Sequence, residues 1–183
     1  MEDIEERADG ILAKIPEYLW DGARLPVPVE DIADSVFGLL VRDVEDLSTA
    51  PGAPKTNDGQ SLSGLLLPAR GEIWVNAVEA RLWPPRRRFT IGHEVGHWVL
   101  HREPGQQALF CRHTSVHDSG PPRPETPRDI EEEASAFAAA LLMPRWLFVR
   151  EHARCGGDIA QLCDTFGTSN AATVRRAAVL FGQ

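Results

Sequence analysis

Two histidines four residues apart, with a glutamate directly after the first, constrain this sequence more than any other feature. The segment is His93-Glu94-Val95-Gly96-His97. An α-helix advances about 100° per residue, so His93 and His97 lie on one face, about 6 Å apart along the axis. Two imidazoles placed in this way can bind one Zn²⁺ at about 2.0–2.1 Å, and Glu94 can reach a water molecule there as a general base. The spacing therefore predicts a metal site on a helix.

The residues around this motif predict that the helix is buried. Phe89 and Leu100 extend the stripe that carries the histidines, and much of the remaining surface is apolar through Ile91, Val95, Trp98 and Val99. A helix that is apolar nearly all round is buried, and buried polar groups need partners. Gly92 and Gly96 each cost about 1 kcal/mol relative to alanine within a helix, so we expect another backbone to approach closely there. These flanks disfavour the alternative, a surface helix with two histidines.

A second helix can supply the third protein ligand. In the metzincin pattern a glycine would stand at 99 and a histidine at 103, but this sequence has Val99 and Glu103, which excludes that class. The second helix is predicted to begin after Thr126 and Pro127, a typical N-cap followed by an N1 proline, and to end at Pro144.

Glu131 is the favoured third ligand on this second helix. It continues the apolar stripe that comprises Ala134, Phe137, Ala138 and Leu141. Glu133 is the second candidate, and Glu132, which points away from the stripe, is the least favoured. A solvated acidic first turn stabilised by the helix dipole is the alternative. Because a metal ion bound by the two histidines needs a third protein ligand, we favour Glu131 as that ligand over the solvated acidic turn.

The two helices together resemble the ImmA/IrrE family of metallopeptidases. The similar stretches are RRFTIGHEVGHWVLH at 87–101 and EEEASAFAAALLMP at 131–144, and GEIWVN at 71–76 resembles the strand usual in that family. The likeness spans roughly the whole chain. It departs mildly at Gly92 and Ser135, where alanine and asparagine are commoner.

The resemblance implies a fold and a reaction. It implies an α+β, zincin-like (gluzincin-type) minimal metallopeptidase domain with a small antiparallel sheet and a buried HExxH helix. His93, His97 and Glu131 would bind Zn²⁺, or Mn²⁺ as the other metal considered, and Glu94 would be the catalytic base. Members of the family typically cleave a helix–turn–helix repressor and so release genes for stress response or mobile-element transfer. A repressor of this kind is therefore the expected protein substrate.

The length is that of one domain, residues 1–183, because a chain of this size can bury a sizeable core unaided. Within it we expect N-terminal helices and a sheet at 1–85, the metal-binding helices at 86–144, and C-terminal helices at 145–183.

The N-terminal part contains several predicted elements. Apolar residues at helical spacing predict a helix that stops at Pro16 and a short helix near 29–36, and residues 38–43 are typical of a strand. Residues 48–61 are a loop by composition. Residues 62–67 and 72–77 predict a β-hairpin, whose second strand could offer an exposed edge that holds substrate as an added strand. A simple core hairpin is an equally favoured and compatible interpretation.

Residues 102–125 form a long segment rich in glycine and proline that joins the two metal-bearing helices. We expect a loop over or beside the cleft. Cys111, His113 or His117 could occupy the open metal position in a resting state, or one of the two histidines could polarise the substrate carbonyl. An ordinary surface loop is the favoured alternative.

Charge and composition exclude some classes of protein. The formal net charge of −8 argues against direct nucleic-acid binding and fits a basic protein partner. The sequence contains no apolar run approaching 18 residues, so no membrane partner is expected. The acidic N-terminus differs from a signal peptide, and the three cysteines include no C-x-x-C pair. These features predict a cytoplasmic protein.

Residues 158–175 resemble a helix–turn–helix, which gives the alternative function: a DNA-binding or protein-interaction regulator with a structural zinc and no proteolytic activity. Its second helix has only Arg175 and Arg176, both late, whereas recognition helices present their base contacts early. We therefore favour packing of this hairpin against the core. The intact Glu94 also argues against the alternative, because zinc binding alone does not require it.

Overall fold

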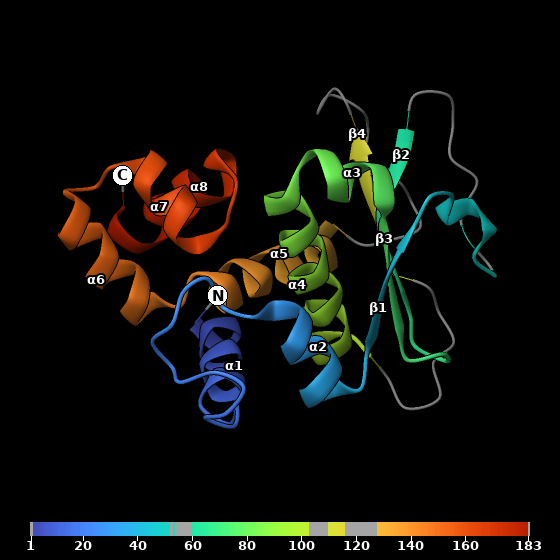
Figure 1. The fold of residues 1–183 in the computed structure, drawn as a ribbon, viewed down its shortest axis with the longest axis horizontal. Coiled ribbons are helices and arrows are strands. Elements are labelled where there is room, and N and C mark those ends of the chain that lie inside the picture. The colour runs from blue at the N-terminus through green and yellow to red at the C-terminus, as the bar shows by residue number, and fades with distance from the viewer. Residues whose placement is uncertain (1, 52, 54–59, 103–109, 116–127, 183) are drawn as a thin grey trace.

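The computed structural model describes residues 2–51, 53, 60–102, 110–115 and 128–182. In these residues a small sheet and the helices at the C-terminus lie on opposite sides of two central helices (Figure 1). No helix in the described part of the chain is both long and apolar enough to cross a membrane.

The sheet has four strands in the order β1-β3-β2-β4, namely β1 at Leu40–Val44, β2 at Gln60–Leu67, β3 at Glu72–Asn76 and β4 at Phe110–Ser115. Strands β2 and β3 form the predicted antiparallel hairpin, and β4 pairs with β2 in the antiparallel sense. The expectation of an entirely antiparallel sheet is wrong. Because β2 is paired on both sides, β1 pairs with the free side of β3, and it runs parallel to that strand.

Two further expectations about the sheet are corrected. Strand β3 lies between β1 and β2, so the strand just before the metal-binding helix has no exposed edge; the edges are β1 and β4. The segment 102–125 is not a continuous loop, because residues 110–115 form β4. Pairing with β2, rather than any strong local pattern, accounts for this strand. The side chains of Cys111 and His113 lie outside what the structure describes, as does the whole of His117.

Two helices, α3 and α4, follow β3 almost directly in the sequence. Asn76 ends the strand and caps α3 (Ala77–Leu82), because its side chain accepts hydrogen bonds from the backbone N–H groups of Val78 and Glu79. Helix α4 (Pro84–Leu100) begins with prolines in its first turn, where no intrahelical donor is lost. Helix α3 was not predicted from the sequence, and the strand predicted at 72–77 ends one residue earlier, at Asn76.

Helix α4 packs against the sheet through β2 and β3 and against α5 (Arg128–Leu142) on its other side. Pro144 follows the end of α5 as predicted, while Thr126 and Pro127 lie outside the described residues. The predicted close approach of another backbone is confirmed at Gly96, whereas at Gly92 the contact is at ordinary packing distance. A Cβ atom at Gly96 would lie 3.0 Å from the carbonyl oxygen of Ala134, and one at Gly92 would lie 3.4 Å from the Cβ of Ala138.

The remaining helices enclose the core around this pair. They are α1 (Glu2–Leu12), α2 (Val29–Phe37), α6 (Arg145–Cys155), α7 (Ile159–Phe166) and α8 (Asn170–Phe181), and a short 3₁₀ helix covers Leu47–Thr49. The predicted packing of the C-terminal hairpin is confirmed, since Leu162 and Phe166 of α7 are fully buried in the main core. Arg176 of α8 is also buried, where it pairs with Glu5 of α1 and donates to the backbone carbonyl of Met143.

Candidate metal centre

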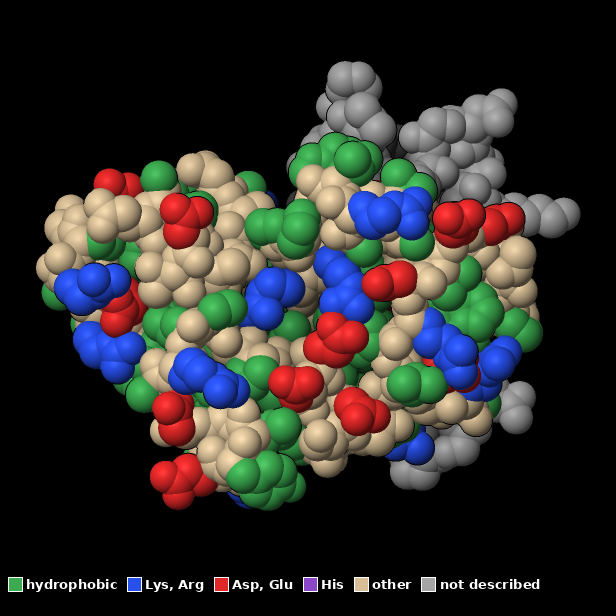
Figure 2. All heavy atoms as spheres, viewed as in Figure 1, with side chains coloured by type: hydrophobic (Ala, Val, Ile, Leu, Met, Phe, Trp, Pro, Cys, Tyr) green, Lys and Arg blue, Asp and Glu red, His purple; other side chains and the backbone are tan. Residues whose placement is uncertain are grey.

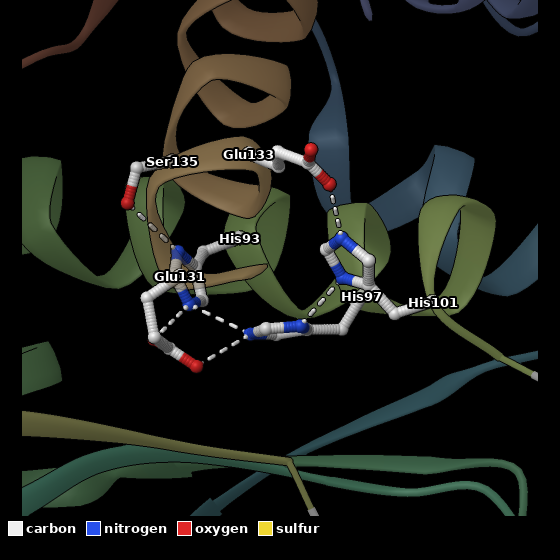
Figure 3. Close-up of polar contacts among 6 residues, drawn as sticks. All are labelled: His93, His97, His101, Glu131, Glu133 and Ser135. Carbon is white, nitrogen blue, oxygen red and sulfur yellow. Dashed lines mark hydrogen bonds and ion pairs between the residues drawn. The ribbon is translucent and has the colours of Figure 1, made fainter. Parts of the chain in front are cut away.

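The two motif histidines lie side by side on the buried face of α4. His93 and His97 are one turn apart and almost completely inaccessible to solvent. Their rings meet edge to face, with centroids 4.7 Å apart, and their Nε2 atoms are 3.0 Å apart (Figure 3). The predicted orientation of both side chains into the protein is therefore observed.

Helix α5 places Glu131 against both imidazoles. One carboxylate oxygen lies 3.1 Å from Nε2 of His93 and the other lies 3.2 Å from Nε2 of His97 (Figure 3). The three residues form the one group in the described part of the chain whose ligand atoms are placed to hold a metal ion. Ligands about 2.0–2.1 Å from a tetrahedral zinc ion are about 3.3 Å from one another. The observed separations are close to this value, so the donor set fits a zinc ion.

The other ring nitrogens of both histidines have partners as well. Nδ1 of His93 lies 3.2 Å from the Ser135 hydroxyl. Nδ1 of His97 lies 3.0 Å from Nδ1 of His101, and the Nε2 of His101 lies 2.9 Å from a carboxylate oxygen of Glu133.

One set of neutral tautomers satisfies all of these contacts and suits metal binding. The Nε2 atoms carry no hydrogen in this set, which distinguishes it from the state in which they donate to Glu131. His97 donates its Nδ1 hydrogen to His101, which in turn donates its Nε2 hydrogen to Glu133, and His93 donates to Ser135. Both Nε2 lone pairs are then directed at the same point. Partners of this kind fix the ring orientation of metal-binding histidines.

The positions of the three acidic residues of α5 follow from these contacts. Glu131 faces the two histidines, Glu133 faces His101 one turn further along α4, and Glu132 is exposed. Glu133 was predicted as the second candidate ligand or as part of a solvated acidic turn, and its pairing with His101 was not predicted. The available signal was the spacing, because His101 follows His97 by four residues and so continues the same helix face.

The electrostatics of the site favour an ionised carboxylate. Burial alone would raise the pKa of Glu131, but its hydrogen bonds and charge interactions with His93 and His97 outweigh that effect and hold this pKa well below its usual value. Burial lowers the pKa of His101, and the neighbouring Glu133 offsets the shift only in part. Ionised glutamate and neutral imidazole are the protonation states that bind a metal.

Glu94 is completely buried on the side of α4 that faces the sheet. A Cβ atom at Gly64 of β2 would lie 3.0 Å from a carboxylate oxygen of Glu94 and 2.3 Å from the Thr90 methyl group. Any side chain at Gly64 would therefore displace Thr90, and with it Glu94 or the strand. The role of Gly64 was not predicted from the sequence, although an isolated glycine within a strand is a known sign that another group approaches the backbone closely.

The structure thus brings together His93, His97 and Glu131, places Glu94 next in sequence beneath β2, and adds His101, Glu133 and Ser135 around them. Two neutral imidazoles and a carboxylate can hold a divalent metal and leave a position for water or substrate. The arrangement is suited to metal-assisted hydrolysis.

Comparison with protein families matches the chain to the peptidase M78 family, described as an IrrE N-terminal-like domain, over residues 46–178. The matched region includes the sheet from β2 onward, both central helices and most of the C-terminal helices. A comparison with curated proteins gives no match.

Proposed function

We propose a specific reaction for this chain, which belongs to the M78 peptidase family of IrrE N-terminal-like domains: zinc-dependent hydrolysis of a peptide bond within a protein. Family membership indicates a metallopeptidase type of function. The observation that supports the finer proposal is the convergence of three residues beside Glu94. The Nε2 atoms of His93 and His97 are 3.0 Å apart, and the two carboxylate oxygens of Glu131 lie 3.1 and 3.2 Å from them.

Each residue of the site has a role in this reaction. His93 and His97 would hold the ion through Nε2, and Glu131 would hold it through its carboxylate. The chemistry that a bound zinc ion supplies is that of a Lewis acid, which polarises the scissile carbonyl and makes a water molecule more acidic. Glu94 accepts a proton from the attacking water and delivers it to the leaving amine. Burial of Glu94 keeps this carboxylate away from bulk solvent.

A helix–turn–helix repressor is the proposed substrate, and the cytoplasm the proposed location. The net charge of −8 supports a basic protein partner. The edge strand β4 contacts α4, so an extended substrate segment could add to the sheet at that edge.

Replacing Glu94 by glutamine tests the proposed reaction. The variant should fold and bind zinc normally but lose activity by about 10²–10⁴-fold, because it lacks only the proton acceptor. Glu17→Gln, an exposed change after α1 that lies outside the site and the cavity beside it, is the matched control and should be as active as the wild type. The assay incubates each zinc-loaded protein with a helix–turn–helix repressor and with casein, and identifies the products by mass spectrometry.

The outcomes separate the proposals. Cleavage of the repressor at a single site, without degradation of casein, is the expected result. Undiminished cleavage by Glu94→Gln would refute the role of Glu94. Degradation of casein at many sites would make the protein a general peptidase and contradict the regulatory substrate.

The second candidate function is a regulator with a structural zinc. It rests on the helix–turn–helix pattern of α7 and α8, but Arg176 is buried against Glu5, which leaves Arg175 as the exposed member of that pair of arginines. Zinc binding together with sequence-specific DNA binding, and no cleavage of any protein, would favour this function.

A further inference from the structure

A cavity of about 940 Å³ opens beside the candidate metal centre. Its walls come from α5, the N-terminal half of α4, α8 and the start of α1. In the surface view, the outline of the molecule is notched between α8 and α3 (Figure 2). Two lining residues, Glu131 and Ser135, belong to the candidate centre. The cavity is therefore continuous with the place where a substrate would be cut.

The described lining of the cavity is mostly apolar. Small residues, among them Ala136 and Ala139 on α5 and Ala172 on α8, leave space between the helices. Larger apolar side chains border that space, and two of them are substantially exposed: Trp83 at 52% and Val179 at 47%. Concave apolar surfaces with a few polar groups at one end are typical of ligand sites.

Two of the charged residues in the lining neutralise one another. Arg176 and Glu5 form an ion pair with each other. The exposed Arg175 and Glu132 come from opposite walls, α8 and α5. An occupant therefore meets mostly apolar surface together with a few charged side chains on the walls.

We propose that this cavity, here called the apolar groove, binds the substrate segment next to the scissile bond and selects large apolar side chains in it. The proposal rests on the proposed peptidase function. Glu131 belongs both to the metal centre and to the lining of the groove, so a peptide whose carbonyl lies at the centre can extend into the groove. Its volume is at the upper end of the range of about 300–1,000 Å³ for ligand pockets, so more than one side chain fits.

Filling the groove tests this proposal. Ala139→Trp and Ala172→Trp each place a large ring in it from opposite walls, and Ala153→Trp on the exposed surface of α6 is the matched control. All three proteins are checked for folding by thermal unfolding and for zinc content. Two filling variants are used so that the failure of one to fold leaves the other to decide.

The substrate probe is a library of 12-residue peptides with leucine, phenylalanine or serine varied at each position. Cleavage is mapped by mass spectrometry. Binding to the zinc-loaded Glu94→Gln protein is measured by fluorescence polarisation of labelled peptides, which needs no turnover. Burial of one leucine or phenylalanine side chain corresponds to a change of roughly 10- to 100-fold in affinity.

The expected result is a preference of at least about 10-fold for leucine or phenylalanine over serine on one side of the cut. The filling variants should lose this preference at unchanged zinc content, and Ala153→Trp should retain it. Cleavage without such a preference, or a preference unaffected by both folded filling variants, would overturn the inference and leave the peptidase function intact. Groove-dependent peptide binding without any cleavage would instead contradict the peptidase function. Binding of a small apolar dye in the groove, without peptide binding, would identify a small-molecule pocket and overturn the inference.

Discussion

Replacing Gly96 by alanine should push apart the two helices that form the candidate metal centre. The added Cβ would lie 3.0 Å from the carbonyl oxygen and 3.1 Å from the Cα of Ala134. Both are backbone atoms, so no side-chain rotation can relieve the contact, and α5 must move by a few tenths of an ångström. Glu131 lies less than one helical turn before Ala134, so the same movement displaces its carboxylate from His93 and His97.

Gly92 provides the matched comparison one turn earlier on α4. A Cβ there would lie 3.4 Å from the Cβ and 3.5 Å from the Cα of Ala138, which is ordinary packing distance. Alanine is favoured over glycine in a helix by about 1 kcal/mol, so Gly92→Ala should stabilise the protein by up to about that amount. At Gly96 the same gain opposes an overpacking cost of about 1–3 kcal/mol. Gly96→Ala should therefore lower the free energy of unfolding by roughly 0–2 kcal/mol.

Urea unfolding in the presence of a chelator measures the stability of each metal-free protein. Titration with zinc, followed by calorimetry, measures the zinc affinity separately. We expect the free energies of unfolding to change in opposite directions, and the zinc affinity to fall about 10-fold or more only in Gly96→Ala, as for changes in groups that orient metal ligands. Equal stabilisation of both variants with unchanged zinc affinity would refute the argument that the contact at Gly96 sets the spacing between α4 and α5.

The remaining predictions concern the partners around the centre and the C-terminal helices. His101→Ala and Glu133→Gln should each weaken zinc binding by about 10–100-fold while far-UV circular dichroism is unchanged; full affinity in both would show that they do not orient the ligand. Arg176→Met should lower the free energy of unfolding by about 3–5 kcal/mol, because it leaves Glu5 without its buried partner. Arg175 is exposed, so Arg175→Met should change the free energy of unfolding by less than about 0.5 kcal/mol. Similar losses in both variants would contradict a structural role for the Arg176–Glu5 pair. Burial alone would raise the pKa of Glu5, but its hydrogen bonds and charge interaction with Arg176 lower it below 4.5. The stabilisation from this pair should therefore be complete above pH 4.5 and disappear as the pH falls through the lowered pKa of Glu5. Urea unfolding of the wild type and of Arg176→Met at several pH values measures this dependence. A difference in the free energy of unfolding that grows as the pH falls would contradict the stabilisation by an ionised Glu5.

The features that the sequence predicts correctly are those with a local physical signal. The spacing of His93 and His97 orients both side chains from a single helix, and the phase of Glu131 relative to Ala134 and Leu141 identifies the face of α5 that meets them. The β2–β3 hairpin also follows from two strands joined by a short turn. Each of these predictions depends on residues only a few positions apart.

The features that the sequence does not predict depend on contacts between distant segments. Strand β4 is a strand because it pairs with β2, and the parallel pairing of β1 with β3 joins distant segments, with Leu40 beside Glu72. The pairing of His101 with Glu133 requires the crossing of α4 and α5 to be known. The apolar groove likewise forms only where α8 lies across from α5.

The zinc content of Glu131→Ala and Glu132→Ala tests the central claim most directly. The two residues are adjacent on α5, but only Glu131 contacts both histidines. After dialysis against a competing chelator, mass spectrometry of the metal should find one zinc per chain in the wild type and in Glu132→Ala, and essentially none in Glu131→Ala. Full zinc content in Glu131→Ala, or loss of zinc in Glu132→Ala, would contradict a centre formed by His93, His97 and Glu131.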